Sequence, residues 1–369
     1  MSSIICTVTN DLAQDQRMIR ICSSLQAAGY DVTLVGRLRK NSRPLVERSF
    51  DQRRLNCWFD RGKFFYLEYN LRLLWFLWRH SANVINSVDL DTLLPGYLIS
   101  RLRKGTICVY DAHEYFTEVP EVTRRPAVQR IWSFLADWII PQLKYAYTVG
   151  PALAKLFTER YRTPFAVIRN VPIRQKTVER QIGEERIILY QGMLNEGRGL
   201  ETMIAAMSLL PEQYRLLLVG SGDVEAQLRD MAKNYKLEGR TQFTGFVRPD
   251  ELPSFTNQAW LGLNLLENTG LSYYYSLANK AFDYIQAGVP SIQMDFPEYR
   301  ALQEEYNCFL LLENLSAEAL AQLILQADGA EATYQQLAQN CQLAATKLNW
   351  DVEEQILLAF YQQILVPKD

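Results

Sequence analysis

The chain has 369 residues, of which 48% are hydrophobic and 22% are charged, and its formal net charge is −2. This length has room for two domains of about 150 to 200 residues each. The nearly balanced charge gives no support for nucleic-acid binding as the main task. Six cysteines are scattered without a close pair, which fits reduced thiols better than a disulfide framework or a zinc site. We therefore expect a cytoplasmic protein.

The first half of the chain predicts an open, parallel α/β fold. Apolar strands at 4–8 and 31–35 flank a helix at 16–28, and so short a crossover favours a βαβ unit. The sequence has neither a basic-then-apolar leader nor a run of about 20 apolar residues, so we expect no export signal and no membrane-spanning helix. Further strands are expected at 84–88, 106–110, 146–149 and 165–168.

The loop after the first strand contains Asp15 and Arg17 but lacks the G-x-G-x-x-G fingerprint of dinucleotide sites. Two interpretations stay open. The loop could face donor phosphates or an acceptor, or its acids could simply cap the helix that follows. We treat Asp15 and Arg17 as candidate residues that shape the acceptor side of a site.

A basic segment precedes an aromatic helix. Residues 37–54 hold seven Arg or Lys side chains, and the helix expected at 64–80 is rich in Phe, Tyr and Trp. Basic residues beside an aromatic amphipathic helix can lie on an anionic membrane surface. The alternative, which we favour, packs this helix on the sheet with its tryptophans in the core. Peripheral membrane contact through 37–80 stays an open hypothesis.

Acidic residues follow the strand at 84–88. Asp89 and Asp91 flank a single leucine, a spacing that can bind metal but that also occurs often by chance. We favour recognition of acceptor hydroxyls, or capping of the helix expected at 92–103.

Asp111, His113 and Glu114 follow the strand at 106–110. His113 is one of only two histidines, and it lies between acids at a strand's carboxyl end. It is therefore a candidate hydrogen-bonding or proton-transfer group, with a structural role as the alternative.

The second half repeats the strand-helix pattern after a polar linker at 174–186. Its first loop, residues 191–200, has three glycines, including Gly192 and Gly199, together with Arg198. Glycines before a helix let backbone N–H groups approach an anion, and the helix dipole adds about 0.3–1 kcal/mol. Later strands are expected at 186–190, 215–219, 241–244, 261–266, 289–294 and 308–312.

The stretch 267–294 joins a strand end, a loop, a helix and another strand. Glu267 lies just past an apolar strand, where open parallel sheets hold their ligands. Lys280 and Asp283 are three residues apart and share a helix face. An ammonium can meet phosphate oxygens, and a carboxylate can accept hydrogen bonds from ribose hydroxyls. A surface ion pair is the alternative.

Residues 111–114, 192–199 and 267–290 resemble the family-4 nucleotide-sugar glycosyltransferases, which have the GT-B fold. The resemblance implies an α/β protein of two doubly wound Rossmann-like domains facing across a cleft. The acceptor domain would span 1–175, the nucleotide-sugar domain 176–349, and a final helix at 350–369 would return to the first domain. The candidate residues then take these roles: catalysis by His113, Glu267, Asp111 and Glu114; donor phosphate binding by Gly192, Arg198, Gly199, Lys280, Gly270 and Asn279; ribose and base binding by Asp283, Gly245, Phe246, Val247 and Gly220; and an acceptor side at Asp15, Arg17, Asp89 and Asp91.

The sequence departs from the family pattern at two places. The second carboxylate, Asp283, lies sixteen positions after Glu267 instead of eight, beyond an inserted tyrosine segment. Met193 stands where the family usually has an arginine. We hypothesise that Lys280 replaces this missing phosphate contact.

The resemblance implies a transferase that moves a sugar from a nucleotide-diphosphate donor, with a UDP-sugar expected, to a hydroxyl of a glycan or lipid-linked acceptor. Retention, independence of metal ions and cofactors, and a place in surface polysaccharide or glycoconjugate synthesis are implied with it. The enzyme would act in the cytoplasm or at the inner face of the cytoplasmic membrane. Two alternatives stay open: a GT-B sugar-nucleotide epimerase, which needs further acid–base groups, and a non-catalytic sugar-nucleotide-binding protein.

Overall fold

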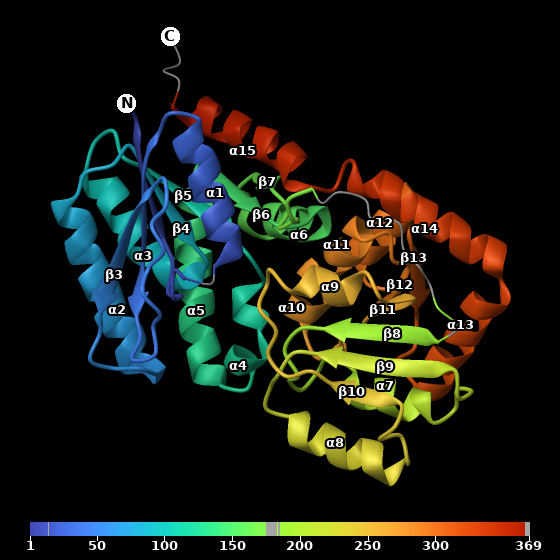
Figure 1. Ribbon diagram of the computed structural model, residues 1–369. Helices are drawn as coiled ribbons and strands as arrows, with labels where there is room; N and C mark the ends of the chain where they lie inside the picture. The colour runs from blue at the N-terminus through green and yellow to red at the C-terminus, as the bar shows by residue number, and fades with distance from the viewer. Residues whose placement is uncertain (14, 175–182, 184, 366–369) are drawn as a thin grey trace. The chain divides into compact units, whose positions relative to one another are not determined.

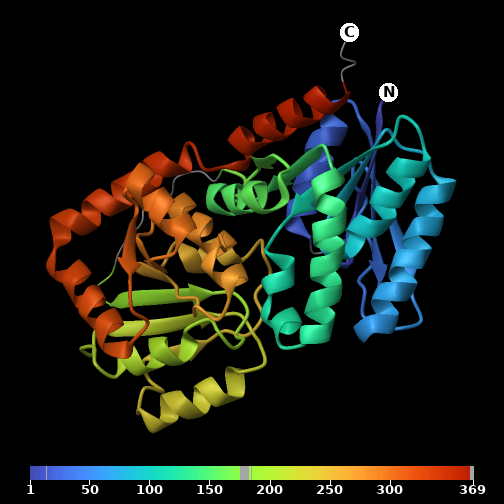
Figure 2. The same cartoon turned by 180° about the vertical axis from the view of Figure 1, so that it is seen from behind.

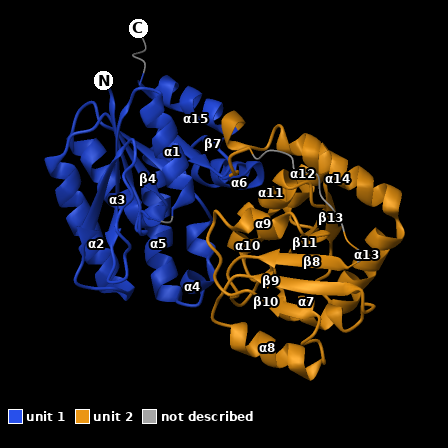
Figure 3. Ribbon diagram, viewed as in Figure 1, with its two compact units in different colours: residues 1–170, 353–369 blue, residues 171–352 orange. Residues whose placement is uncertain are grey.

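The computed structural model describes residues 1–13, 15–174, 183 and 185–365, and it contains two compact units. Unit 1 comprises residues 1–170 and 353–369, and unit 2 comprises residues 171–352 (Figure 3). From Glu353 on, the last helix therefore belongs to unit 1, although the chain reaches it through unit 2. Most of the linker predicted at 174–186 lies outside the described residues.

Unit 1 is built on a seven-stranded parallel sheet with the order β3-β2-β1-β4-β5-β6-β7 (Figure 1). Its strands are β1 (Ser3–Thr7), β2 (Asp31–Leu38), β3 (Asp51–Asn56), β4 (Val84–Val88), β5 (Ile107–Ala112), β6 (Tyr145–Thr148) and β7 (Phe165–Val167). Its helices are α1 (Gln16–Ala27), α2 (Gly62–Arg79), α3 (Leu90–Leu102), α4 (Pro120–Thr123), α5 (Pro126–Ile139), α6 (Pro151–Tyr161) and α15 (Trp350–Leu365), with short 3-10 turns η1 (Phe116–Glu118) and η2 (Ile140–Gln142).

The strand order places helices on both faces of this sheet. From β1 the chain turns to β2 on one side, whereas β4 leads to β5 in the opposite direction. Right-handed crossovers therefore put α1 and α3 on opposite faces. α2 and α5 both contact α3 and form one layer with it (Figures 1 and 2). The reversal between β1 and β4 is where such sheets hold ligands, outside the carboxyl ends of the strands.

α2 packs on the sheet, but not through the side chains that we expected. The residues that it buries recur every four positions and are Phe65, Tyr69, Leu73 and Leu77. Trp75 and Trp78 instead remain 59% and 57% exposed, so the prediction of a tryptophan core was wrong. At about 100° per residue, neither tryptophan lies on the buried stripe, which the four-residue repeat defines.

β3 is the strand that the sequence did not predict. Its sequence, DQRRLN, has no alternation of apolar residues. β3 pairs only with β2 at the edge of the sheet and buries none of its side chains fully, so it needs no such alternation. Charged side chains are typical of such edges, where they discourage pairing with other chains. Part of the predicted basic segment is therefore sheet, and Arg54 on β3 is paired with Asp11.

Unit 2 has a six-stranded parallel sheet with the order β10-β9-β8-β11-β12-β13. Its strands are β8 (Arg186–Gln191), β9 (Tyr214–Val219), β10 (Thr241–Phe243), β11 (Leu261–Asn264), β12 (Ser291–Met294) and β13 (Phe309–Leu312). Its helices are α7 (Leu200–Met207), α8 (Glu225–Asn234), α9 (Leu252–Thr256), α10 (Leu271–Tyr274), α11 (Asn279–Gln286), α12 (Pro297–Tyr306), α13 (Ala317–Gly329) and α14 (Glu331–Ala345). The order reverses between β8 and β11, so the loops after these two strands meet at the carboxyl edge.

Candidate functional site

In unit 1, a buried guanidinium on α1 joins residues at the carboxyl ends of β5 and β7. Arg17 on α1 is 3% exposed; its Nη2 donates to Asp111 Oδ1 at 3.1 Å, and its Nη1 donates to the Ile168 carbonyl at 3.1 Å. Asp111 is fully buried within β5, which extends two residues further than predicted. Burial disfavours its charged form, but Arg17 and His113 outweigh this effect and hold the pKa of Asp111 below its ordinary value.

His113 follows β5 and shares one ring nitrogen between two partners. Nε2 lies 2.9 Å from Nε of Arg17 and 3.0 Å from Oδ2 of Asp111. A neutral ring with its proton on Nδ1 accepts from Arg17, whereas a protonated ring donates Nε2–H to Asp111. Burial lowers the pKa of His113, yet Asp111 and Asp89 raise it above its ordinary value overall. The imidazole is thus fixed in place by charged groups and can carry a proton.

Asp89 and Asp91 lie beside this histidine. Asp89 has φ of 54°, and its Oδ1 accepts from the His113 backbone N–H at 2.9 Å instead of capping α3. Asp91 is buried and accepts from Thr9 Oγ1 at 2.7 Å. Burial, together with nearby acids, raises the pKa of both carboxyls to about 7. Near neutral pH these carboxyls can therefore accept a hydrogen bond from a hydroxyl when they are charged, and can donate one to it when they are protonated.

Two predicted residues lie at the margin of this cluster. Asp15 caps α1, since its Oδ1 accepts from the Met18 N–H at 3.1 Å. That contact matches the capping interpretation of the first loop. Glu114 is exposed just beyond His113.

In unit 2, three glycine loops meet backbone to backbone. The Gly220 N–H donates to the Gly245 carbonyl at 3.1 Å, and a methyl group added to Gly220 would lie 1.9 Å from the Gly192 carbonyl oxygen. Gly199 has φ of 67°, and a methyl group there would lie 2.4 Å from the Leu265 carbonyl oxygen. Only glycine allows both approaches. Local packing thus requires the glycines predicted at 199 and 220.

Lys280 is the unusual residue of this site. Its side chain is 7% exposed, and its Nζ has no hydrogen-bond partner within the described parts of the chain. Nζ lies 3.8 Å from the centroid of the Tyr190 ring and 3.2 Å from the position of a methyl group built on Gly192. Burial and then Arg198 lower the pKa of Lys280 well below its ordinary value. A buried amine without a partner is costly unless a ligand satisfies it.

The placement of Lys280 follows from how α11 is anchored. Tyr284, one turn later on the same helix face, donates its O–H toward the carbonyls of Leu189 and Leu263, each at 3.1 Å. This fixes α11 across β8 and β11, so Lys280 points at the loop that follows β8. Asp283 is held in turn by Gln191, whose Nε2 donates to Oδ2 at 2.9 Å.

Glu267 lies at the same edge of unit 2. It is partly exposed, and its backbone N–H donates to the Gly197 carbonyl at 2.9 Å. Burial, followed by the acids Glu201 and Glu196, raises its pKa. The ring of the inserted Tyr273 packs on the same loop. It lies so close to Gly197 that a methyl group built on this glycine would be 3.0 Å from the ring.

The remaining predicted residues are more peripheral. Gly270 precedes α10, Asn279 is exposed at the start of α11, and Phe246 is 61% exposed beside Val247. Sequence reasoning missed Tyr190 and Gln191. Their only signal is that they end the strand directly before Gly192, where side chains reach a carboxyl-edge site.

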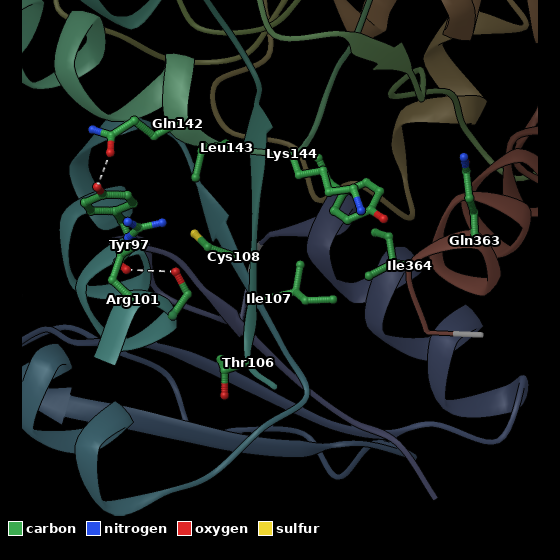
Figure 4. Close-up of a pocket in the computed structure, with 12 residues that line it drawn as sticks. Tyr97, Arg101, Thr106, Ile107, Cys108, Gln142, Leu143, Lys144, Gln363 and Ile364 are labelled. Atoms are coloured by element: carbon green, nitrogen blue, oxygen red, sulfur yellow. Dashed lines mark hydrogen bonds between the residues drawn. The ribbon is translucent and has the colours of Figure 1, made fainter. Parts of the chain in front are cut away.

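A separate cavity of about 450 Å³ lies at the opposite end of β5 in unit 1 (Figure 4). Ile107 and Cys108 line it at the amino end of the strand, whereas His113 follows the carboxyl end. Tyr97 closes one side by donating its O–H to Gln142 at 2.7 Å. Burial raises the pKa of the Cys108 thiol to about 12, so this sulfur is a weak nucleophile. The cavity does not belong to the cluster around His113.

Within residues 1–13, 15–174, 183 and 185–365, no group of three or more His, Cys, Asp and Glu side chains is placed to hold a metal ion. No helix in that part of the chain is both long enough and apolar enough to cross a bilayer. The six cysteines are all free.

Comparison with known proteins places these features in context. Residues 173–344 match the sequence model of the family described as glycosyl transferases group 1. An uncharacterized glycosyltransferase of Methanocaldococcus jannaschii is 33% identical over 78 residues, so the match covers 21% of this chain and 20% of that protein. Among solved structures, sucrose-phosphate synthase from Thermosynechococcus elongatus has a TM-score of 0.82 at 19% identity, with 99% of each chain covered. HepE from Anabaena, in complex with UDP and glucose, has a TM-score of 0.77 at 16% identity, with 98% of this chain and 100% of that chain covered.

At these identities the solved structures establish the fold alone. Both units have the Rossmann-like parallel sheet, and their likeness to these structures and to WaaG, a glycosyltransferase with a TM-score of 0.76 at 16% identity, confirms the predicted GT-B fold class.

Proposed function

We propose that this chain, whose residues 173–344 match the model of the group 1 glycosyl transferases, moves a sugar from a UDP-sugar to a hydroxyl of a glycan or lipid-linked acceptor. We further propose that the configuration at the anomeric carbon is retained and that neither metal nor cofactor is needed. The product would be a surface polysaccharide or glycoconjugate, made at the inner face of the cytoplasmic membrane. HepE, which has the same fold, was solved in complex with UDP and glucose, and this supports the choice of donor.

The observation that carries this proposal is the buried amine of Lys280 beneath the glycine loops, which has no hydrogen-bond partner among the residues that the structure describes. The partly exposed Arg198 follows the same end of β8. Such donors stabilise the negative charge that a diphosphate leaving group gains in the transition state, and a preorganised donor is worth several kcal/mol there. Lys280 would supply the contact that Met193 cannot.

In unit 1, His113 would hydrogen-bond the transferred sugar or the acceptor hydroxyl. Arg17 and Asp111 keep its ring oriented. Asp89 lies next to the imidazole, with Oδ2 at 4.0 Å from Nδ1, and would accept a hydrogen bond from the acceptor.

A panel of nucleotide sugars tests the donor site. We expect UDP-sugars to raise the melting temperature, since a ligand at 100 times its Kd adds about 2.7 kcal/mol to the free energy of unfolding. NMR of the product, formed with a matching acceptor, would then show the configuration at the anomeric carbon. Stabilisation without either transfer or hydrolysis would support the binding-protein alternative, and no stabilisation by any nucleotide sugar would contradict the proposal.

We also propose that unit 1 binds an anionic membrane through one face, here called the aromatic face. It consists of exposed apolar side chains on α2 and α5: Phe64, Leu67, Leu71, Trp75, Trp78, Ile131, Phe134 and Trp138. The two helices touch through Tyr66 and Trp132, whose ring centroids are 5.5 Å apart. Cations accompany the rings, as Arg79 lies 4.7 Å from the centroid of Trp75. Exposed aromatics with basic neighbours are typical of interfacial helices.

Vesicle binding tests the aromatic face. The double substitution Trp75→Ser and Trp78→Ser is expected to weaken sedimentation with phosphatidylglycerol vesicles at least about tenfold, because each ring loses apolar burial in the bilayer. Leu343→Ser is the matched control, since Leu343 is 67% exposed on α14 of unit 2. Equal vesicle binding by both variants would contradict this proposal.

A further inference from the structure

Another cavity of unit 1, lined by polar and charged side chains, lies where β2 ends and α2 begins. Its volume is about 550 Å³, and its lining consists of Arg37, Arg39, Lys40, Asn41, Asp60 and Arg61. Four of these six residues are cations, whereas Asp60 is the one carboxylate among them. Lys40 is 87% exposed at the rim, although its Nζ also lies 3.7 Å from Asp60 Oδ2. The charge balance of this cavity favours an anion.

The buried member of the set is Arg37, which is 4% exposed. Its Nη2 donates to Asp60 Oδ1 at 2.8 Å and to the Phe59 carbonyl at 3.2 Å, and its guanidinium lies 3.9 Å from the centroid of the Phe65 ring. Its Nε–H has no hydrogen-bond partner among the residues that the structure describes. Arg37 therefore has one carboxylate partner, Asp60, and a buried guanidinium that lines a cavity with an unsatisfied N–H can take a further acceptor.

The start of α2 adds a second, independent feature. This 18-residue helix has no side-chain cap at Arg61 and no acidic residue in its first turn. The first turn itself therefore supplies no negative charge to its N–H groups and dipole, and the carboxylate of Asp60, just before the cap, is paired with Arg37 and Lys40. A phosphate group would satisfy both the helix start and the cations.

From these features we infer that this cavity binds a phosphate group, and that the phosphate belongs to the acceptor. The cavity lies at the carboxyl end of β2, and His113 follows the carboxyl end of β5, so both are at the same edge of one sheet. With β1 and β4 between them, the two strands are about 14 Å apart at the usual strand spacing. The inference rests on the proposed function and narrows its acceptor to a glycan that carries phosphate or diphosphate at about that distance from the reacting hydroxyl.

Binding of inorganic pyrophosphate tests the cavity without any need for turnover. The titration is done by calorimetry in a Lys280→Gln background, which removes the cation of the glycine loops in unit 2. Adding Arg39→Gln and Lys40→Gln is expected to weaken binding about 100-fold, about tenfold for each charge-assisted contact. Arg53→Gln is the matched control, because Arg53 is 61% exposed on β3 and does not line the cavity. Equal affinities for the double variant and the control would overturn the inference.

Two further arms identify the source of the phosphate. In an otherwise wild-type chain, Arg39→Gln and Lys40→Gln should raise the KM for a phosphorylated acceptor at least tenfold and leave the KM for the donor unchanged. Sedimentation with phosphatidylglycerol vesicles should change less than threefold. A large loss of vesicle binding with no change in pyrophosphate affinity would assign the cations to lipid headgroups and overturn the acceptor assignment. If no nucleotide sugar stabilises the protein but pyrophosphate binds as expected, the proposed function fails and the phosphate site stands.

Discussion

Replacing Lys280 by methionine is expected to lower kcat/KM for the nucleotide sugar by about 100- to 1000-fold. This is the usual cost of removing one preorganised hydrogen-bond donor from an active site. The same variant should be more stable than the wild type by about 1 to 3 kcal/mol, because it no longer buries an unpartnered polar group. Activity and stability should therefore move in opposite directions. A residue that served only packing would not produce this pattern.

The pH dependence of stability sharpens this test. The pKa of Lys280 is depressed in the folded protein from an ordinary value of 10.5, so the unfolded chain binds more protons in the window between the two values. Wild-type stability should therefore rise with pH toward about 10.5, whereas Lys280→Met should lack this contribution. The gap between the two proteins should be largest near neutral pH and should close in alkaline solution.

Chemical unfolding at several pH values and donor kinetics at neutral pH measure both effects. Lys233→Met, on the exposed side of α8, is the control for removing a positive charge. An unchanged kcat/KM in Lys280→Met would contradict the proposal that this residue binds the diphosphate of the donor. A less stable variant would show that the amine is satisfied in the folded protein.

How far the sequence predicts this architecture depends on the kind of signal. Each strand predicted from the sequence is present in the described residues, with ends that differ by up to three positions, because buried parallel strands are short apolar runs. The edge strand β3 has no such run and was missed. The sequence predicted an aromatic helix at α2, and the structure has one. Which of its aromatic side chains face the core depends on the rotation of the helix about its axis, and this rotation is fixed only by packing against β1, β2 and β4.

The candidate sites show the same division. Strand ends and glycines located the loops around Gly192 and His113, because parallel topology brings carboxyl ends together. The sequence suggested that Lys280 could serve the loop of Gly192, but only the fold shows that its amine is buried there with no hydrogen-bond partner among the described residues. Arg17 was chosen as a residue that shapes the acceptor side, and nothing in its local sequence indicates a contact with Asp111, 94 positions away.

Replacing Arg17 by methionine is expected to reduce the free energy of unfolding by about 3 to 5 kcal/mol, the usual result of leaving one member of a buried ion pair without its partner. Asp111 is fully buried, so water cannot replace the guanidinium. The double variant with Asp111→Asn should recover most of the loss, since no uncompensated charge then remains. Recovery of this kind distinguishes a charge effect from the packing loss of a long side chain.

The pH dependence of the Arg17 effect has a definite sign. The folded pKa of Asp111 lies below its ordinary value of 3.8, so its contribution to stability is present above about pH 4 and is lost as the pH falls through the folded value. The difference between the wild type and Arg17→Met should therefore be large at pH 7 and should shrink in acid. Urea unfolding at pH 7 and below pH 4 measures this difference. A loss of the same size at both pH values, with no recovery in the double variant, would mean that Arg17 acts through packing and that His113 takes its orientation from other contacts.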